Sequence, residues 1–232
     1  MKFYRLKLYI KYLPGIRTMD RLYNRMKFIK QDQKKQIALK EQGKSAIKVV
    51  ELALTELGIK HFVYFGNLLG IIRDGRFMEY DDDLDYGIII EKDFSWDNLE
   101  KDLTRYNLRK IRQFSFDGFI TEQTYAFADV TIDIFGCYFV ESSMNSYLYF
   151  RKEGYIYNSK YDYHVGRFDY TKVIGTHKIV KDGITYTVPV NAEELLESIY
   201  SESWRIPDKN WDHTKGRNFH ELNTIGCLEY FG

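Results

Sequence analysis

The stretch Tyr64–Ile90 reads YFGNLLGIIRDGRFMEYDDDLDYGIII, a glycine-bounded turn followed by clustered acids that run into an apolar segment. Within it, Asp81, Asp83 and Asp85 are spaced by two residues. In an extended chain, side chains alternate between faces, so these carboxylates would point the same way. Like charges this close repel one another, and burial raises their pKa values, so we expect a cation among them. Mg2+ held by oxygen ligands together with a substrate phosphate is the usual case.

Two alternatives compete with this interpretation of the acids. A calcium loop of the EF-hand type begins in the same way. Counted from Asp81, however, position 6 is Tyr86 where glycine is needed, and position 12 is Lys92 where glutamate is needed. A merely solvated acidic loop is the other alternative. The apolar strand that directly follows, and the glycine turn with Arg73 and Arg76 upstream, favour a binding site over it.

The composition is that of a folded protein of 232 residues, enough for one domain or one domain with an appendage. The two cysteines, Cys137 and Cys227, form no disulfide framework and no metal-binding spacing, and we expect buried thiols in a reducing cytoplasm. Residues 1–50 hold 14 Lys/Arg and 3 Asp/Glu, a net of +11, and the remaining 182 hold 20 and 30, a net of −10. A basic arm on an acidic body suggests a polyanionic partner.

The basic arm begins with residues 1–13, which place apolar side chains at helical spacing among lysines and an arginine, and Pro14-Gly15 ends this segment. The apolar run is too short and too often broken by lysine for a signal peptide or a membrane span. A basic amphipathic helix either binds the interface of an anionic leaflet or docks on its own domain. We therefore separate an arm, residues 1–32, from a main domain, residues 33–232, and expect an anionic membrane surface to contact residues 1–30. No RNA-binding signature is visible, so we expect no nucleic-acid partner.

Helices and strands alternate along the main domain, which predicts one α/β unit, of the α+β kind, with a mixed sheet flanked by helices. Apolar periodicity and glycine turns predict a helix over 33–57, a strand over 59–65 and a short helix over 66–73, followed by the aspartate-rich strand. A helix capped by Ser95, a hairpin at Asp117-Gly118 and a strand over 129–140 come next. The chain then has a hairpin at Asp182-Gly183 and a helix capped by Asn191 and Glu194 that runs through Tyr200. The N-terminal amides of the 66–73 helix are suited to hold a phosphate.

The strand predicted over 129–140 carries a further acid. Val130, Ile132 and Ile134 alternate there with polar residues, and Asp133 is one of these. Asp133 therefore opposes the apolar face. If this strand neighbours the aspartate-rich one, Asp133 meets Asp83 and Asp85.

These residues resemble the LicD/fukutin family of phosphotransferases, which has the nucleotidyltransferase fold. The family hallmark is Gly-Thr/Ser-Leu-Leu-Gly, an Arg three residues on, and Trp-Asp-x-Asp-x-Asp before an apolar strand. It later has an Asp-containing strand and a closing Tyr-Gly-x-x-Trp motif. The matching segments cover about residues 45–210 and are Gly66–Gly70, Arg73, Tyr80–Asp85, Val130–Phe135, Val188–Val190, Leu195-Leu196 and Tyr200–Pro207. The chain departs from the pattern at Asn67, Tyr80 and Ser201, where the family has Thr or Ser, Trp and Gly.

The resemblance implies that residues 33–232 form a catalytic domain that transfers a phosphoalcohol from a CDP-linked donor to a hydroxyl of a cell-surface glycan, such as capsule, lipopolysaccharide or teichoic acid. CDP-choline, CDP-glycerol and CDP-ribitol are examples of the donor. The acceptor would be a glycan or a lipid-linked glycan, and the enzyme would work in the cytoplasm or on the inner face of the cell membrane.

The roles that follow are hypotheses for each residue. Asp83 and Asp85 would bind Mg2+ or Mn2+, with Asp81 as a ligand directly or through water. Asp133 would be a further ligand or the base for the acceptor hydroxyl. Arg73, and more weakly Arg76, would clamp the pyrophosphate, since a guanidinium matches phosphate oxygens. The turn at Gly66 and Asn67 would support the diphosphate.

Two other functions remain open at this point. One is a nucleotidyltransferase of the same fold that adds NMP to a small molecule or a macromolecule. The other is a non-catalytic family member that binds anionic surfaces through its basic arm.

Overall fold

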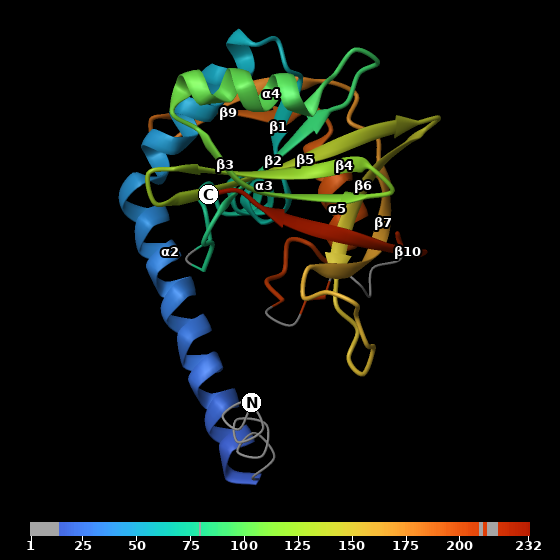
Figure 1. Cartoon of the computed structure of the whole chain (residues 1–232). Helices are drawn as coiled ribbons and strands as arrows, with labels where there is room; N and C mark the ends of the chain where they lie inside the picture. Colours follow the sequence, from blue (N-terminus) through green and yellow to red (C-terminus); the bar gives the residue numbers. More distant parts are fainter. Residues whose placement is uncertain (1–13, 79, 209–210, 213–217) are drawn as a thin grey trace.

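The computed structural model describes residues 14–78, 80–208, 211–212 and 218–232. The amphipathic helix predicted for residues 1–13 lies outside these described residues. The domain is built on a mixed sheet of eight strands with helices beside it (Figure 1). In spatial order the strands are β1 (His61–Val63), β2 (Leu84–Ile89), β5 (Val130–Val140), β4 (Phe119–Phe127), β3 (Arg109–Phe116), β10 (Phe219–Tyr230), β7 (Asp162–Thr171) and β6 (Ser143–Phe150).

The sheet is largely antiparallel, and its single parallel pair within the described chain is β2 with β5. It also curls back on itself, because β6 pairs with the end of β5 through Tyr138 and Asn145. A separate two-stranded sheet consists of β8 (Thr176–Lys181) and β9 (Ile184–Pro189). The parallel pair matters most for function, because it brings the ends of two distant segments to the same place.

The helices are α2 (Pro14–Glu56), α3 (Phe65–Arg73), α4 (Trp96–Leu103), the 3-10 turn η1 (Thr104–Tyr106) and α5 (Ala192–Tyr200). Helix α2 runs along one side of the sheet, and its N-terminal part extends past it (Figure 1). The helix predicted over 33–57 is therefore the second half of a longer one that already begins at Pro14, a residue well suited to the first turn of a helix.

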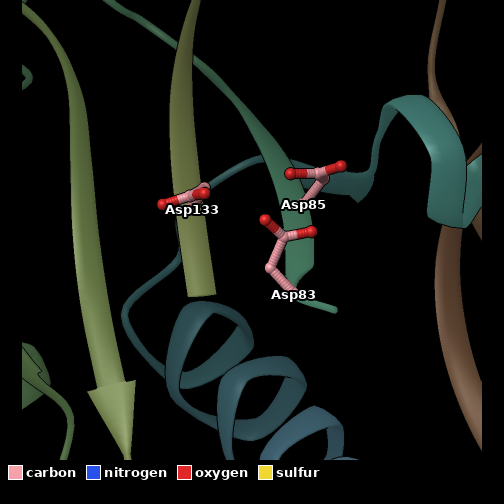
Figure 2. A group of neighbouring side chains, drawn as sticks. All are labelled: Asp83, Asp85 and Asp133. Atoms are coloured by element: carbon pink, nitrogen blue, oxygen red, sulfur yellow. The ribbon is translucent and has the colours of Figure 1, made fainter. Parts of the chain in front are cut away.

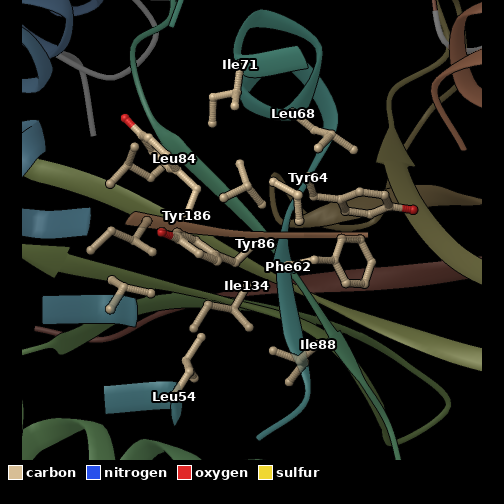
Figure 3. Packing of buried hydrophobic residues seen from close by; sticks show 14 of the residues in the cluster. Leu54, Phe62, Tyr64, Leu68, Ile71, Leu84, Tyr86, Ile88, Ile134 and Tyr186 are labelled. Carbon is tan, nitrogen blue, oxygen red and sulfur yellow. The ribbon is translucent and has the colours of Figure 1, made fainter. Parts of the chain in front are cut away.

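The hydrophobic core lies where α2 and α3 pack against β1, β2 and β5 (Figure 3). Leu54 of α2, Phe62 of β1 and Ile134 of β5 are fully buried in it. Gly87 allows this packing, because a Cβ atom at that position would lie 2.6 Å from the Phe62 ring. The apolar alternation in β5 is confirmed, since Val130, Ile132 and Ile134 are buried.

Most of the predicted local signals are confirmed. Ser95 caps α4 by accepting a hydrogen bond from the Asn98 backbone amide at 3.3 Å. The hairpin turns at Asp117-Gly118 and Asp182-Gly183 connect β3 to β4 and β8 to β9, with positive φ at all four residues. The strand predicted over 59–65 is shorter, because the chain turns into α3 at Phe65, which has a φ of +40°.

Two local predictions are wrong. Asn191 precedes α5, but its side chain makes no capping hydrogen bond among the described residues. It instead accepts from the Ile174 amide at 3.2 Å and donates to the Lys172 carbonyl at 2.9 Å, so it holds the loop between β7 and β8. Cys137 is a buried free thiol as predicted, whereas the free thiol of Cys227 is exposed because β10 turns that face to solvent.

Candidate functional site

Three carboxylates converge where β2 and β5 run side by side. The parallel register pairs Asp85 with Asp133, and Asp83 lies directly before β2. Each of the three residues offers an oxygen within 4.8 Å of the others, and Figure 2 shows the three side chains as neighbours on adjacent segments of the sheet. The structure thus brings Asp133 to the two acids of the quoted stretch, 50 and 48 residues away in sequence (133 − 83 and 133 − 85).

Burial and mutual repulsion dominate the electrostatics of this cluster. Burial, with the charges of Asp133 and Asp82, raises the pKa of Asp83 to about 7. Burial and the charges of Asp83 and Asp133 raise the pKa of Asp85 well above its usual range. Carboxylates are hard oxygen donors, and three of them this close together fit a divalent cation, whose charge would relieve their mutual repulsion.

Asp81 lies beside the cluster and does not complete it. The predicted extended run starts at Asp81, whereas β2 begins at Leu84, so the alternation of faces does not reach back to Asp81. Its carboxylate accepts from the Met78 backbone amide at 3.0 Å and from the Asn67 side chain at 3.3 Å. Burial raises the pKa of Asp81 to about 6 against these two hydrogen bonds, which lower it.

Asn67 is turned toward the acids. It is 1% exposed, and its side chain bonds the backbone of Asp85 and Asp83 as well as the Asp81 carboxylate. Gly66, one residue earlier, lines the pocket in front of the cluster. The family-like turn therefore supports the acid-bearing segment directly, a role that the sequence alone did not assign to Asn67.

The two arginines predicted to meet phosphate are placed differently. Arg73 lines the pocket, and its guanidinium donates to the Asp74 carboxylate at 2.9 and 2.7 Å. Arg76 is not among the described residues that line the pocket. Lys35 of α2 brings a further cation close, since it pairs with Asp82 at 3.2 Å.

Arg112 and Thr124 are site residues that the sequence analysis missed. Arg112 on β3 donates from one nitrogen to both Asp133 oxygens at 3.1 Å. Thr124 on β4 donates its hydroxyl to the same carboxylate. No spacing signal identifies these two residues, because only the cross-strand register of β3, β4 and β5 brings them to Asp133.

The cluster opens into a pocket of about 820 Å³. Its lining includes six acids, Asp81, Asp82, Asp83, Asp85, Asp133 and Asp208. It also includes seven aromatic residues, Phe65, Phe135, Tyr147, Phe168, Tyr200, Trp204 and Trp211. A pocket of this size accommodates a small-molecule ligand, and the carboxylates and the aromatic side chains of the lining would both be available to contact it.

This chain is similar, at 13% sequence identity, to two solved structures of one protein, ANT(2″)-Ia. The crystal structure of ANT(2″)-Ia in complex with adenylyl-2″-tobramycin matches over 74% of this chain and 82% of that one, with a TM-score of 0.41. The solution structure of the antibiotic-resistance factor ANT(2″)-Ia matches over 72% of this chain and 77% of that one, with a TM-score of 0.40. No curated protein matched.

A mixed sheet with flanking helices here sets a carboxylate cluster in a pocket, and the family model that matches the chain describes a nucleotidyltransferase domain. The model of the family LicD/FKTN/FKRP, nucleotidyltransferase domain, matches residues 58–191. This match covers more than half of the 232 residues, and the chain belongs to that family.

Proposed function

We propose that this chain is a metal-dependent transferase that moves a phosphoalcohol from a CDP-linked donor to a hydroxyl of a cell-surface glycan. The observation that carries the proposal is the convergence of Asp83, Asp85 and Asp133 in a pocket large enough for a nucleotide-linked donor. Membership of the LicD/FKTN/FKRP family supports the same class of chemistry.

In the proposed reaction, the acceptor hydroxyl attacks the phosphorus that bears the alcohol. A new P–O bond forms to the glycan oxygen, the P–O bond to the bridging oxygen breaks and that oxygen leaves with CMP, and the hydroxyl proton is released to solvent. Such a transfer requires mainly positioning and neutralisation of charge. A Mg2+ or Mn2+ ion would supply positive charge to the phosphate oxygens when bound.

Each protein group has a defined task in this proposal. Asp83, Asp85 and Asp133 would hold the cation, and Asp81 would contact it directly or through water. Arg73 would turn from Asp74 to the diphosphate, where a guanidinium matches two oxygens. The amides that follow Gly66 at the start of α3 would support the same group.

The deciding experiment is product analysis by mass spectrometry. The protein is incubated with CDP-choline, CDP-glycerol or CDP-ribitol, or with ATP or CTP, together with a panel of lipid-linked glycans and Mn2+. We expect CMP and a phosphoalcohol-modified glycan from one of the CDP-alcohols. Transfer of NMP with release of pyrophosphate would replace this proposal by the nucleotidyltransferase alternative. No turnover together with no metal binding would identify a non-catalytic family member.

The place of action belongs to the same proposal. No helix within the described ranges is both long and apolar enough to cross a membrane. We propose that the enzyme works in the cytoplasm on the inner face of the cell membrane, where residues 1–30 contact anionic lipid. Sedimentation with anionic and neutral vesicles tests this part, and equal binding to both would contradict it.

A further inference from the structure

A row of four residues crosses the sheet at the site. Arg112 on β3 is paired with Thr124 on β4, Thr124 with Asp133 on β5, and Asp133 with Asp85 on β2. Residues paired in this way point to the same face of the sheet. The row therefore places the Arg112 guanidinium and the Thr124 hydroxyl on the side of Asp133 that faces away from Asp85.

The contacts within this row close a ring around one carboxylate. Arg112 reaches both Asp133 oxygens with one nitrogen, and its Nε donates to the Thr124 hydroxyl at 2.8 Å. The Thr124 hydroxyl in turn donates a hydrogen bond to Asp133 Oδ1. Each of the three side chains thus fixes the other two.

This ring limits what Asp133 can still do. A carboxylate offers about four lone-pair positions. Two donors occupy Oδ1 and one occupies Oδ2, so about one position on Oδ2 remains. An oxygen of Asp133 lies within 4.8 Å of oxygens from Asp83 and Asp85, so a ligand shared by the three has room for one bond to Asp133.

The position of Arg112 argues against direct contact with the donor. Its side chain is 28% exposed, and it is not among the described residues that line the pocket. Asp133 stands between it and the other acids, since β5 lies between β4 and β2. Arg112 therefore acts through Asp133.

We infer that Arg112, with Thr124, is a positioning residue that holds Asp133 as a metal ligand, and that Asp133 is not the base for the acceptor hydroxyl. The inference rests on the proposed metal site and settles the role that the sequence left open for Asp133. Partners of metal ligands typically change metal affinity by about 10- to 100-fold when they are removed.

The test measures Mn2+ binding by calorimetry on the full chain, without substrate, and then turnover. In Arg112→Lys the charge stays, but one ammonium cannot keep all the guanidinium contacts. We expect Mn2+ affinity to fall about 10-fold or more, kcat to fall, and the donor KM to stay unchanged. Arg167→Lys is the matched control, because Arg167 is paired with Asp169 at 2.7 and 2.9 Å on β7, and it should leave all three values unchanged.

Two further variants keep the inference falsifiable if Arg112→Lys unfolds. Thr124→Val removes the hydroxyl at nearly constant volume, and it should weaken Mn2+ binding in the same direction. Asp133→Asn should lose Mn2+ affinity if Asp133 is a ligand, whereas a base would lose kcat and keep the affinity.

The outcomes separate this inference from the proposed function. Unchanged Mn2+ affinity in folded Arg112→Lys and Thr124→Val would overturn the positioning role. A raised donor KM with unchanged Mn2+ affinity would assign Arg112 to the donor instead. A wild-type protein that binds no Mn2+ would overturn the metal site itself, and the role of Arg112 with it.

Discussion

Asn67 Oδ1 accepts a hydrogen bond from the backbone amide of Asp85 at 2.6 Å. Its amide nitrogen donates at 3.3 Å to the Asp81 carboxylate and to the Asp83 carbonyl. One side chain of α3 thus ties the three acids of the quoted stretch to the start of β2. The position where the family has a hydroxyl residue here carries an amide, whose oxygen accepts while its separate nitrogen donates.

The first prediction concerns this contact. Asn67→Ala leaves the part-buried Asp85 amide without its acceptor, and we expect the free energy of unfolding to fall by about 1–3 kcal/mol. Asn67→Ser, which brings back a hydroxyl of the kind the family has, should recover part of the loss. Urea denaturation measures both variants. If Asn67→Ala were as stable as wild type, another group would have to accept the hydrogen bond from the Asp85 backbone amide.

A second prediction concerns the acids themselves. Asp83→Asn and Asp85→Asn should each lower turnover by at least about 100-fold, since even indirect partners of a metal commonly account for 10- to 100-fold in activity. Both variants should also raise the melting temperature of the metal-free protein, because each replaces a carboxyl group whose ionisation is opposed by burial and by neighbouring like charges.

The matched control for these variants is Asp129→Asn. Asp129 is 59% exposed in its side chain and pairs with Lys34 at 3.7 Å, outside the pocket. Turnover and melting temperature should stay at wild-type values in this variant. Normal turnover in Asp83→Asn would refute the assignment of Asp83.

A third prediction is a dependence of stability on pH. The pKa of Asp83 is raised to about 7 and that of Asp81 to about 6. In the unfolded chain both titrate near ~3.9. At pH values between the unfolded and the folded pKa, the folded protein binds more protons than the unfolded chain does, so its stability falls as pH rises. The contribution of both groups to the free energy of unfolding is therefore full below pH ~4 and is lost as pH rises through 6 and 7.

Urea denaturation with a chelator at a series of pH values between 4 and 8 tests this slope. Comparison of wild type with Asp83→Asn isolates the contribution of one group, and the variant should show a shallower decline. Added Mn2+ should restore stability at pH 8, because a ligand that binds only the folded state stabilises it. An equal slope in wild type and variant would contradict the raised pKa of Asp83.

Local patterns in the sequence were sufficient for part of the site. The two-residue spacing identified Asp83 and Asp85, and the alternation of apolar residues around Asp133 placed it on the correct face. Both signals are carried by neighbours along the chain. The parallel pairing of β2 and β5 was a condition in that argument, and the structure satisfies it.

Contacts that depend on the pairing of strands distant in the sequence could not be predicted from local patterns. Arg112 lies 21 residues before Asp133, and Thr124 lies 9 before it, at separations that depend on the lengths of two antiparallel connections. Asn191 had the sequence of a helix cap, but a loop amide and a carbonyl brought near by tertiary structure compete for its side chain. In both cases the contact is decided by a partner that is distant in the sequence, so the residues next to each position along the chain could not predict it.

The last prediction concerns backbone strain at the end of α5. Ser201 follows this helix with φ 74° and ψ 175°, in a region that is essentially restricted to glycine. Strain of this kind amounts to about 1–3 kcal/mol. The LicD pattern has glycine at this position, so we expect Ser201→Gly to raise the free energy of unfolding by about 1 kcal/mol, after the extra flexibility of glycine in the unfolded chain is subtracted.

Two controls separate the backbone from the side chain, because the Ser201 hydroxyl also contacts the Ser203 hydroxyl at 3.1 Å. Ser201→Ala removes this contact and keeps the strain, and Ser203→Ala removes it from the other side. Neither should stabilise the protein, whereas Ser201→Gly should shift the urea midpoint upward at an unchanged slope. If Ser201→Ala stabilised the protein as much as Ser201→Gly, the hydroxyl and not the backbone would be the source of the effect.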